Sequence, residues 1–308
     1  MSTFTLPIID ISSFTTTTKK TQEVDELKLK TAKEIHEACM KTGFFYIKGH
    51  NVPKEICDNV LNLGREFFKL SQEEKNKLSI SNEDYRGYQR LGENVTRYQK
   101  DWHEALDYYK PIPPTHPLVI GNLPLKGENR WPEHPSEFRK VFEEYIEYMK
   151  DLGAKVMSAI ALGLGLEENY FVEYLDDSFW VMRIIGYPSL RSSRGTDRLS
   201  NLFKPGALEV RTKNGDWIQA DPIPDAFVVN IGDMLNIWTN NLYQSTLHRV
   251  IHKSDDYRVS VPFFYEPNFD AKINPIEQCL KIDPIKHYDS VIYGEHLIKK
   301  VTVNFEVA

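Results

Sequence analysis

Hydrophobic residues in the first half of the chain recur every three or four positions, which predicts a mainly helical half. A first helix is predicted from Val24 to Lys41, because apolar residues keep this spacing at Leu27, Ala32, Ile35 and Ala38. A second is predicted to follow, with apolar residues at Ile56, Val60, Leu63, Phe67 and Phe68. Behind it, Ser71 and Glu74 form a capping box for a short helix.

Two short strands and one long helix complete the pattern of this half. The strands are predicted at Pro7–Ile11 and Phe44–Ile47, and the helix from about Pro135 to Leu164. The stretch from Leu106 to Pro135 is rich in proline and glycine, and we interpret it as loop.

After Leu166 the periodicity changes from helical to alternating. Short runs of β-branched and aromatic residues are separated by turn residues, which is typical of a sandwich or barrel. The predicted strands are Trp180–Ile185, Ala207–Arg211, Trp217–Ile218, Ala226–Asn230, Ser245–Ile251 and Tyr257–Tyr265. The pattern therefore predicts an α+β protein with a helical N-terminal half and a β C-terminal half.

Composition narrows the class of protein. The 308 residues carry a formal net charge of −6 without a long basic run, which argues against nucleic acid or an anionic membrane as the main partner. The first residues lack the pattern of a secretory signal, and no segment is apolar enough to cross a bilayer. Three scattered cysteines indicate a reducing compartment. We therefore expect a cytoplasmic protein.

Several long motifs, in the right order, resemble those of one known family. Two lie near the start of the chain, "LPIIDIS" (Leu6–Ser12) and "GFFYIKGHNVP" (Gly43–Pro53), and two in the middle, "YRGYQRLGE" (Tyr85–Glu93) and "HEALDYY" (His103–Tyr109). Three more follow, "GDWIQADPIPDAFVVNIGDMLNIWTN" (Gly215–Asn240), "STLHRV" (Ser245–Val250) and "YRVSVPFFYEP" (Tyr257–Pro267). The chain resembles the isopenicillin N synthase-like family of iron- and 2-oxoglutarate-dependent oxygenases, and most of all its iron/ascorbate oxidoreductases.

The resemblance implies a double-stranded β-helix (jelly-roll) core that binds Fe(II) through two histidines and a carboxylate. His248 matches the second histidine of that triad. Arg258 and Ser260 match the Arg-x-Ser pair that binds the far carboxylate of 2-oxoglutarate, and alternation places both on one face of a strand. Arg183 and Tyr187 resemble positions that line the co-substrate pocket, although core packing explains them equally well.

The first histidine and the carboxylate of the triad are not found where the family has them. The nearby sequence is Gly195-Thr196-Asp197, and glycine offers no side chain to a metal. Either glycine replaces the histidine, so that Asp197 and His248 form a two-residue site, or a segment carrying His-x-Asp is deleted. We favour deletion, because no alternating strand can be read between Ser189 and Gly206. One core strand is then missing. A single imidazole would bind Fe(II) weakly.

The sequence thus predicts three regions: a helical region at 1–166, the β-core at 167–285 and a C-terminal segment at 286–308. The expected function is Fe(II)- and 2-oxoglutarate-dependent oxidation of a small organic substrate, with ascorbate as a further cofactor. The alternative is a catalytically defective family member, truncated or produced by splicing, or a non-enzymatic small-molecule-binding protein. The identity of the substrate lies beyond these motifs.

Overall fold

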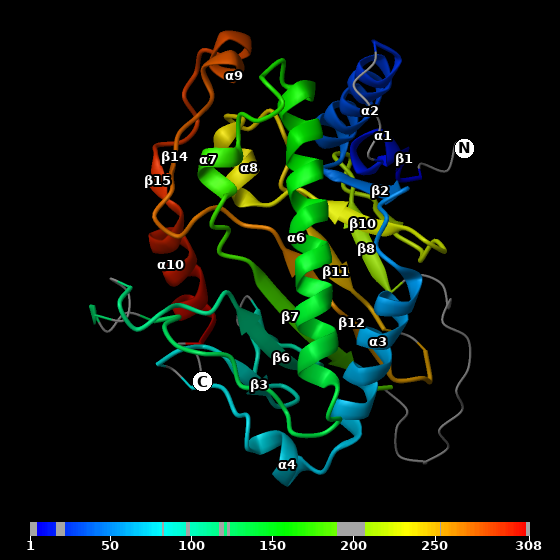
Figure 1. The fold of residues 1–308 in the computed structure, drawn as a ribbon, viewed down its shortest axis with the longest axis vertical. Helices are drawn as coiled ribbons and strands as arrows, with labels where there is room; N and C mark the ends of the chain where they lie inside the picture. The colour runs from blue at the N-terminus through cyan, green and yellow to red at the C-terminus, as the bar shows by residue number, and fades with distance from the viewer. Residues whose placement is uncertain are drawn as a thin grey trace.

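The fold is that of a computed structural model, which describes residues 5–16, 22–81, 83–96, 99–116, 120–121, 124–189, 207–252 and 254–305. Figure 1 shows strands in the middle of the molecule and the long helix α6 (Phe138–Gly163) running across them. α6 packs against α2 (Gln22–Lys41) and α3 (Lys54–Lys69), and all three agree with the helical periodicity. Shorter helices are α1 (Ser12–Thr15), α4 (Gln72–Asn76), α7 (Val172–Leu175), α8 (Asp233–Trp238), α9 (Glu277–Ile282) and α10 (Tyr293–Phe305).

The strands of the core form three principal sheets. One pairs β1 (Ile8–Asp10), β2 (Phe44–Lys48) and β10 (Phe227–Asn230); a second pairs β11 (His248–Val250), β8 (Leu208–Arg211) and β9 (Trp217–Gln219). The third has the order β12 (Arg258–Ser260), β7 (Val181–Tyr187), β6 (Glu104–Tyr109) and β3 (Gly87–Gln89), with β13 (Phe263–Phe264) also paired to β7. Two-stranded ribbons join β4 (Val95–Thr96) to β5 (Gln99–Lys100) and β14 (Lys272–Ile273) to β15 (Val291–Ile292).

Three core strands each keep one open edge within the described residues. β10 pairs only with β2, β11 only with β8, and β12 only with β7. A closed β-core would pair both edges of its central strands. Residues 190–206, where a core strand was expected to be missing, lie outside the described residues, so that expectation stays a prediction.

The expected loop from Leu106 to Pro135 is wrong at its start. Residues 104–109 form β6, whose six side chains are all buried and which pairs along its whole length with β7. The loop was expected from proline and glycine further along the stretch, whereas the charged residues Glu104 and Asp107 are held in the strand by partners distant in the sequence. The strand expected at Ser245–Ile251 is shorter than predicted, since β11 covers only His248–Val250.

Glu104 is the centre of a buried polar network between β6 and its neighbours. Its Oε2 accepts hydrogen bonds from Lys75 Nζ at 2.7 Å and from the Tyr88 hydroxyl at 2.5 Å. Its Oε1 accepts one from the Tyr257 hydroxyl at 2.7 Å. A buried carboxylate is tolerated only with such partners. Through Glu104, the network connects α4 and β3 to Tyr257, the residue before Arg258.

Gly186 is the position where this network allows no side chain. It lies opposite Glu104 in the sheet, and a Cβ built on it would lie 2.0 Å from the Tyr257 hydroxyl oxygen. We expect Gly186→Ala to displace Tyr257 and to lower the free energy of unfolding by about 1–3 kcal/mol. Urea denaturation followed by circular dichroism measures this, with Gly232→Ser as the control, since nothing lies within 4 Å of a Cβ at Gly232 and its φ is −92°. Equal stability of Gly186→Ala and the unsubstituted chain would contradict the prediction.

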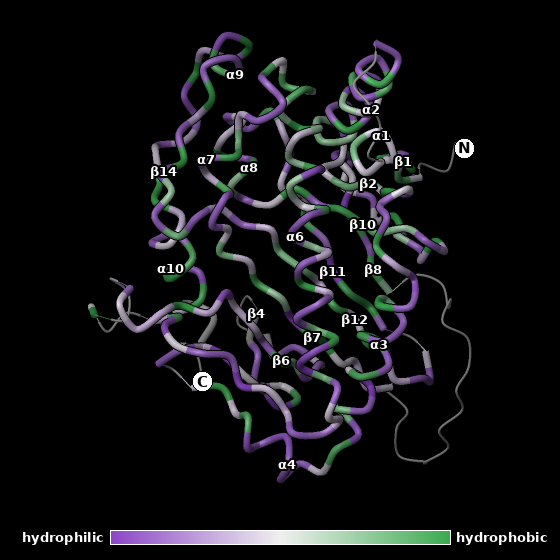
Figure 2. Tube along the Cα trace, in the orientation of Figure 1, coloured by the Kyte–Doolittle hydropathy of each residue, from purple (hydrophilic) through white to green (hydrophobic). Residues whose placement is uncertain are grey.

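Apolar residues concentrate on strands between the helices, as the green segments of β7 and β10 show in Figure 2. The larger core cluster includes residues of α2, α3, α6 and β7, so both halves of the chain contribute to one hydrophobic interior. No helix in the described parts of the chain has the length and apolar character needed to cross a membrane.

Candidate functional site

A large cleft lies among the three sheets and helix α6. Its volume is about 2240 Å³, well above the roughly 300–1000 Å³ of a typical small-molecule site. Strand residues on β7, β10, β11 and β12 line it, together with residues of α6 and α10. The excess volume is consistent with the open strand edges that border it. All the described residues that the sequence singled out for the site line this cleft: His248, Arg258, Ser260, Arg183 and Tyr187.

His248 begins β11 and faces the cleft with an exposed side chain. Its Nδ1 lies 3.1 Å from the Thr246 carbonyl oxygen, and its ring packs edge-on against Phe44 at a centroid distance of 5.2 Å. The contact with the carbonyl oxygen requires a proton on Nδ1, which leaves Nε2 as the nitrogen able to ligate a metal. His248 is therefore oriented as a ligand would be.

The rest of a metal site does not assemble around His248. Among the described residues, no three His, Cys, Asp or Glu side chains come together in a way that could hold a metal ion. Asp197, the other ligand considered, lies outside the described residues. The residues that the structure places here do not fit a centre of two histidines and a carboxylate.

Arg258 is held as an anion-binding group would be. It lies opposite Tyr187 in the β12–β7 pair, with its guanidinium carbon 4.8 Å from the centre of the Tyr187 ring. Its Nη1 is buried and has no hydrogen-bond partner among the described residues. Ser260 follows two residues later, so its hydroxyl shares the strand face of Arg258. A buried guanidinium nitrogen without a hydrogen-bond partner favours a bound carboxylate, which would supply the missing acceptor.

Arg183 is engaged elsewhere in the sheet. Its Nε donates to Asp107 Oδ1 at 2.7 Å, and Gln89 donates to the other carboxylate oxygen at 2.5 Å. Burial raises the pKa of Asp107, and the charge of Arg183 opposes that rise. The core interpretation of Arg183 thus accounts for its main contact, although its side chain still lines the cleft.

Two histidines that the sequence pattern did not select also reach this end of the cleft. The ring centroids of His103 and His252 lie 5.6 Å and 6.5 Å from that of Tyr187. Burial, helped by the charge of Arg183, lowers the pKa of His103 to about 4, so its ring is neutral at physiological pH. Its Nε2 is buried without a partner in the described part of the chain. Sequence spacing gave no signal for either residue.

Glu266 was missed by the sequence analysis altogether. It follows β13 and lines the cleft beyond the end of β7. A signal was available, since Arg258, Ser260 and Glu266 are separated by even numbers of residues, and an extended chain presents such residues on one face. The cleft therefore has a cationic end at Arg258 and an acidic end at Glu266.

Family models match two parts of the chain. Residues 6–134 match the "non-haem dioxygenase in morphine synthesis N-terminal" model, and residues 197–267 match the "2OG-Fe(II) oxygenase superfamily" model. A rice protein named homoarginine-6-hydroxylase 2-ODD-233 is 43% identical, with 97% of each chain covered. A probable iron/ascorbate oxidoreductase of Dictyostelium discoideum is 36% identical, covering 96% of this chain and 93% of its own.

A solved structure is similar to this chain over nearly its whole length. The crystal structure of a full-length Neurospora crassa protein in complex with alpha-KG superposes with a TM-score of 0.79 at 27% identity, covering 96% of both chains. The alignment with the rice protein spans 322 positions, more than the 308 residues of this chain. The rice relative thus holds residues for which this chain has no counterpart.

Proposed function

Because the chain belongs to the 2OG-Fe(II) oxygenase superfamily, we propose that its cleft takes 2-oxoglutarate at Arg258 and Ser260 and a basic amino acid at the opposite end. Members of this superfamily are Fe(II)- and 2-oxoglutarate-dependent dioxygenases that act on small organic substrates. The fold and the relatives place this chain among those enzymes. The proposal concerns which residues bind the co-substrate and which substrate is bound.

The buried Nη1 of Arg258 is the observation that carries the co-substrate site. A carboxylate bound there would accept hydrogen bonds from the guanidinium and from the Ser260 hydroxyl, both on the same strand face. The stacked Tyr187 ring restricts the guanidinium to one orientation. The neutral His103 nearby adds no competing positive charge.

A basic amino acid is the substrate class that we favour. The rice relative is named a homoarginine hydroxylase and is similar over almost the whole chain. The acidic end of the cleft suits the cationic side chain of such a molecule, because opposite charges attract strongly where water is partly excluded. L-homoarginine is therefore the first substrate to test.

A second function is favoured by one observation on the metal site. The sequence has no histidine between His134 and His248, and the described residues hold no three-ligand cluster. With His248 as the single ligand that the structure places, Fe(II) would bind weakly. In this alternative, the chain binds 2-oxoglutarate and the amino acid without oxidising it.

One assay separates the two functions. The purified chain is incubated with Fe(II), ascorbate, 2-oxoglutarate and L-homoarginine, while succinate formation is measured and 2-oxoglutarate binding is followed by calorimetry without iron. Succinate formation that depends on homoarginine and is lost in His248→Ala is the expected result for the enzyme. Binding without succinate would establish the second function. Failure to bind 2-oxoglutarate would contradict both.

The remaining proposals rest on composition and pattern alone. We propose a cytoplasmic location and no nucleic acid or membrane partner, because the net charge is −6 and basic runs are absent. We also propose that the boundaries of the three regions fall at 166/167 and 285/286.

A further inference from the structure

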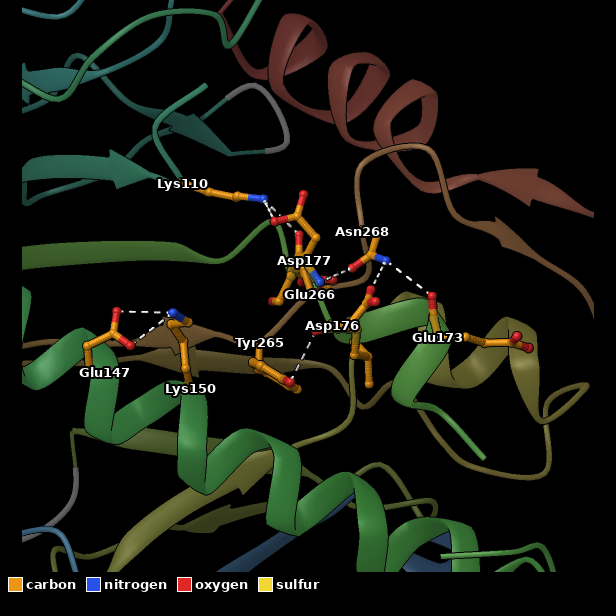
Figure 3. Close-up of polar contacts among 11 residues, drawn as sticks. Lys110, Glu147, Lys150, Glu173, Asp176, Asp177, Tyr265, Glu266 and Asn268 are labelled. Atoms are coloured by element: carbon orange, nitrogen blue, oxygen red, sulfur yellow. Dashed lines mark hydrogen bonds and ion pairs between the residues drawn. The ribbon is translucent and has the colours of Figure 1, made fainter. Parts of the chain in front are cut away.

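The acidic end of the cleft is built around Glu266, whose backbone is fixed on both sides. The Ser178 hydroxyl donates to the Glu266 carbonyl oxygen at 2.7 Å, and the Phe179 amide donates to the carbonyl oxygen of Pro267 at 3.0 Å. Asn268 then donates to the Asp176 carboxylate at 2.7 Å, a contact drawn beside Glu266 in Figure 3. Glu266 is thus held in place by the turn between α7 and β7.

The carboxylate of Glu266 has no counter-ion among the described residues. Within that same part of the chain, its single hydrogen bond runs through the backbone, and no ion pair reaches its side chain. The neighbouring charges are already matched, since Lys110 pairs with Asp177 and Lys300 lies 2.6 Å from the carboxylate of Asp233. Burial, together with the charge of Asp233, raises the pKa of Glu266 to about 7. An uncompensated carboxylate facing a cleft is stabilised by a cation that enters it.

A second unsatisfied group lies beside it. Tyr293, the first residue of α10, lines the cleft with only 2% of its surface exposed, and its hydroxyl has no partner among the residues that the structure describes. The Tyr293 ring lies 6.4 Å from that of Phe179, whose amide donates to the carbonyl oxygen of Pro267, so Tyr293 and Glu266 line the same part of the cleft. A buried hydroxyl without a partner normally indicates an absent ligand or water.

The distance to the co-substrate end fits two molecules bound end to end. Along β7, Arg258 lies opposite Tyr187 and Phe264 lies opposite Val181. Six residues of extended strand span roughly 20 Å, and Glu266 lies two residues beyond Phe264. This separation leaves room for a dicarboxylate at Arg258 and an extended amino acid reaching Glu266.

We propose that the Glu266 carboxylate, assisted by the Tyr293 hydroxyl, binds the guanidinium group of a basic amino acid substrate. This inference rests on the proposed function, because it assigns the substrate end of the same cleft. Glu266 accepts hydrogen bonds from the planar guanidinium, and the Tyr293 oxygen accepts one more. The two unsatisfied groups of the cleft wall are then paired.

The test compares L-homoarginine with L-homocitrulline, in which a neutral urea replaces the guanidinium at the same chain length. Both are titrated by calorimetry into the full chain in the presence of 2-oxoglutarate. Glu266→Gln should weaken homoarginine binding about 10- to 100-fold and leave homocitrulline binding within about twofold. Tyr293→Phe should weaken homoarginine binding by a smaller factor. Glu147→Gln is the matched control, because Glu147 lies on α6 with its carboxylate exposed and paired to Lys150.

The outcomes separate this inference from the proposed function. Homoarginine binding that is equal in the unsubstituted chain and in Glu266→Gln would overturn the role of Glu266 and leave the substrate class standing. If the unsubstituted chain binds 2-oxoglutarate but not homoarginine, both the substrate class and the role of Glu266 are overturned. Glu266→Gln should fold normally, because it removes a charge that burial disfavours; thermal unfolding at pH 8 checks this.

Discussion

Replacing Arg258 with glutamine is expected to weaken 2-oxoglutarate binding about 100-fold or more. The guanidinium is the one described cation with a buried, unpartnered nitrogen in the cleft, so the variant loses a charge-assisted, two-pronged interaction. Glutamine keeps a polar side chain of similar length but can neither donate through two parallel N–H groups nor carry charge. Calorimetric titration with 2-oxoglutarate, without added metal, measures the change directly.

The matched control is Arg139→Gln. Arg139 lies on the exposed face of α6, where it pairs with Glu143 at 2.8 Å, and such surface pairs contribute little. The control should bind 2-oxoglutarate with unchanged affinity. A dissociation constant for Arg258→Gln within about threefold of the unsubstituted value would remove Arg258 from the co-substrate site. Ser260→Ala should give an intermediate loss of about fivefold, because one neutral donor is removed.

The largest expected effect on stability comes from the network of Glu104. In Glu104→Ala, the buried ammonium of Lys75 keeps only the Phe68 carbonyl oxygen at 3.3 Å as a hydrogen-bond acceptor among the described residues, and the Tyr88 and Tyr257 hydroxyls lose their shared acceptor. Removing one partner of a buried ion pair costs about 3–5 kcal/mol. We expect the free energy of unfolding to fall by that amount, as measured by urea denaturation.

A double variant distinguishes the unpaired charge from the lost packing. Lys75→Met combined with Glu104→Leu removes both charges and keeps most of the side-chain volume, so it should be clearly more stable than Glu104→Ala. Glu143→Ala, on the exposed face of α6, should change the stability by less than about 1 kcal/mol. If Glu104→Ala were as stable as Glu143→Ala, the network would have no structural role. Because Tyr257 precedes Arg258, Glu104→Ala should also weaken 2-oxoglutarate binding.

Local patterns in the sequence were sufficient for the helices and for the strand that carries Arg258 and Ser260. Apolar spacing placed α2 and α6 within a few residues of their observed ends, and Ser71 is confirmed as the N-cap of α4, because its hydroxyl oxygen accepts a hydrogen bond from the Glu74 amide at 3.2 Å. Alternation placed Arg258 and Ser260 on one strand of the core, where β12 is found. These features depend on residues a few positions apart, so the sequence carries them directly.

The metal ligand expected at His248 can be compared with the structure only in its position. The sequence identified His248 as the one metal ligand of the expected triad, and the structure turns that side chain into the cleft. The missing core strand stays a prediction as well, because residues 190–206 lie outside the described part of the chain, where β10, β11 and β12 each keep one unpaired edge. The role of His248 as a ligand stays a prediction.

The family, the α+β architecture and the Arg258–Ser260 pair were thus determined by the sequence alone. The tertiary structure decided that Glu104 and Asp107 belong to a central strand, and that Glu266 has no counter-ion among the described residues. The physical reason is the same in both cases. A carboxylate is satisfied or left unpaired by groups far away in the chain, such as Lys75 and Arg183, and only the folded molecule brings those groups together.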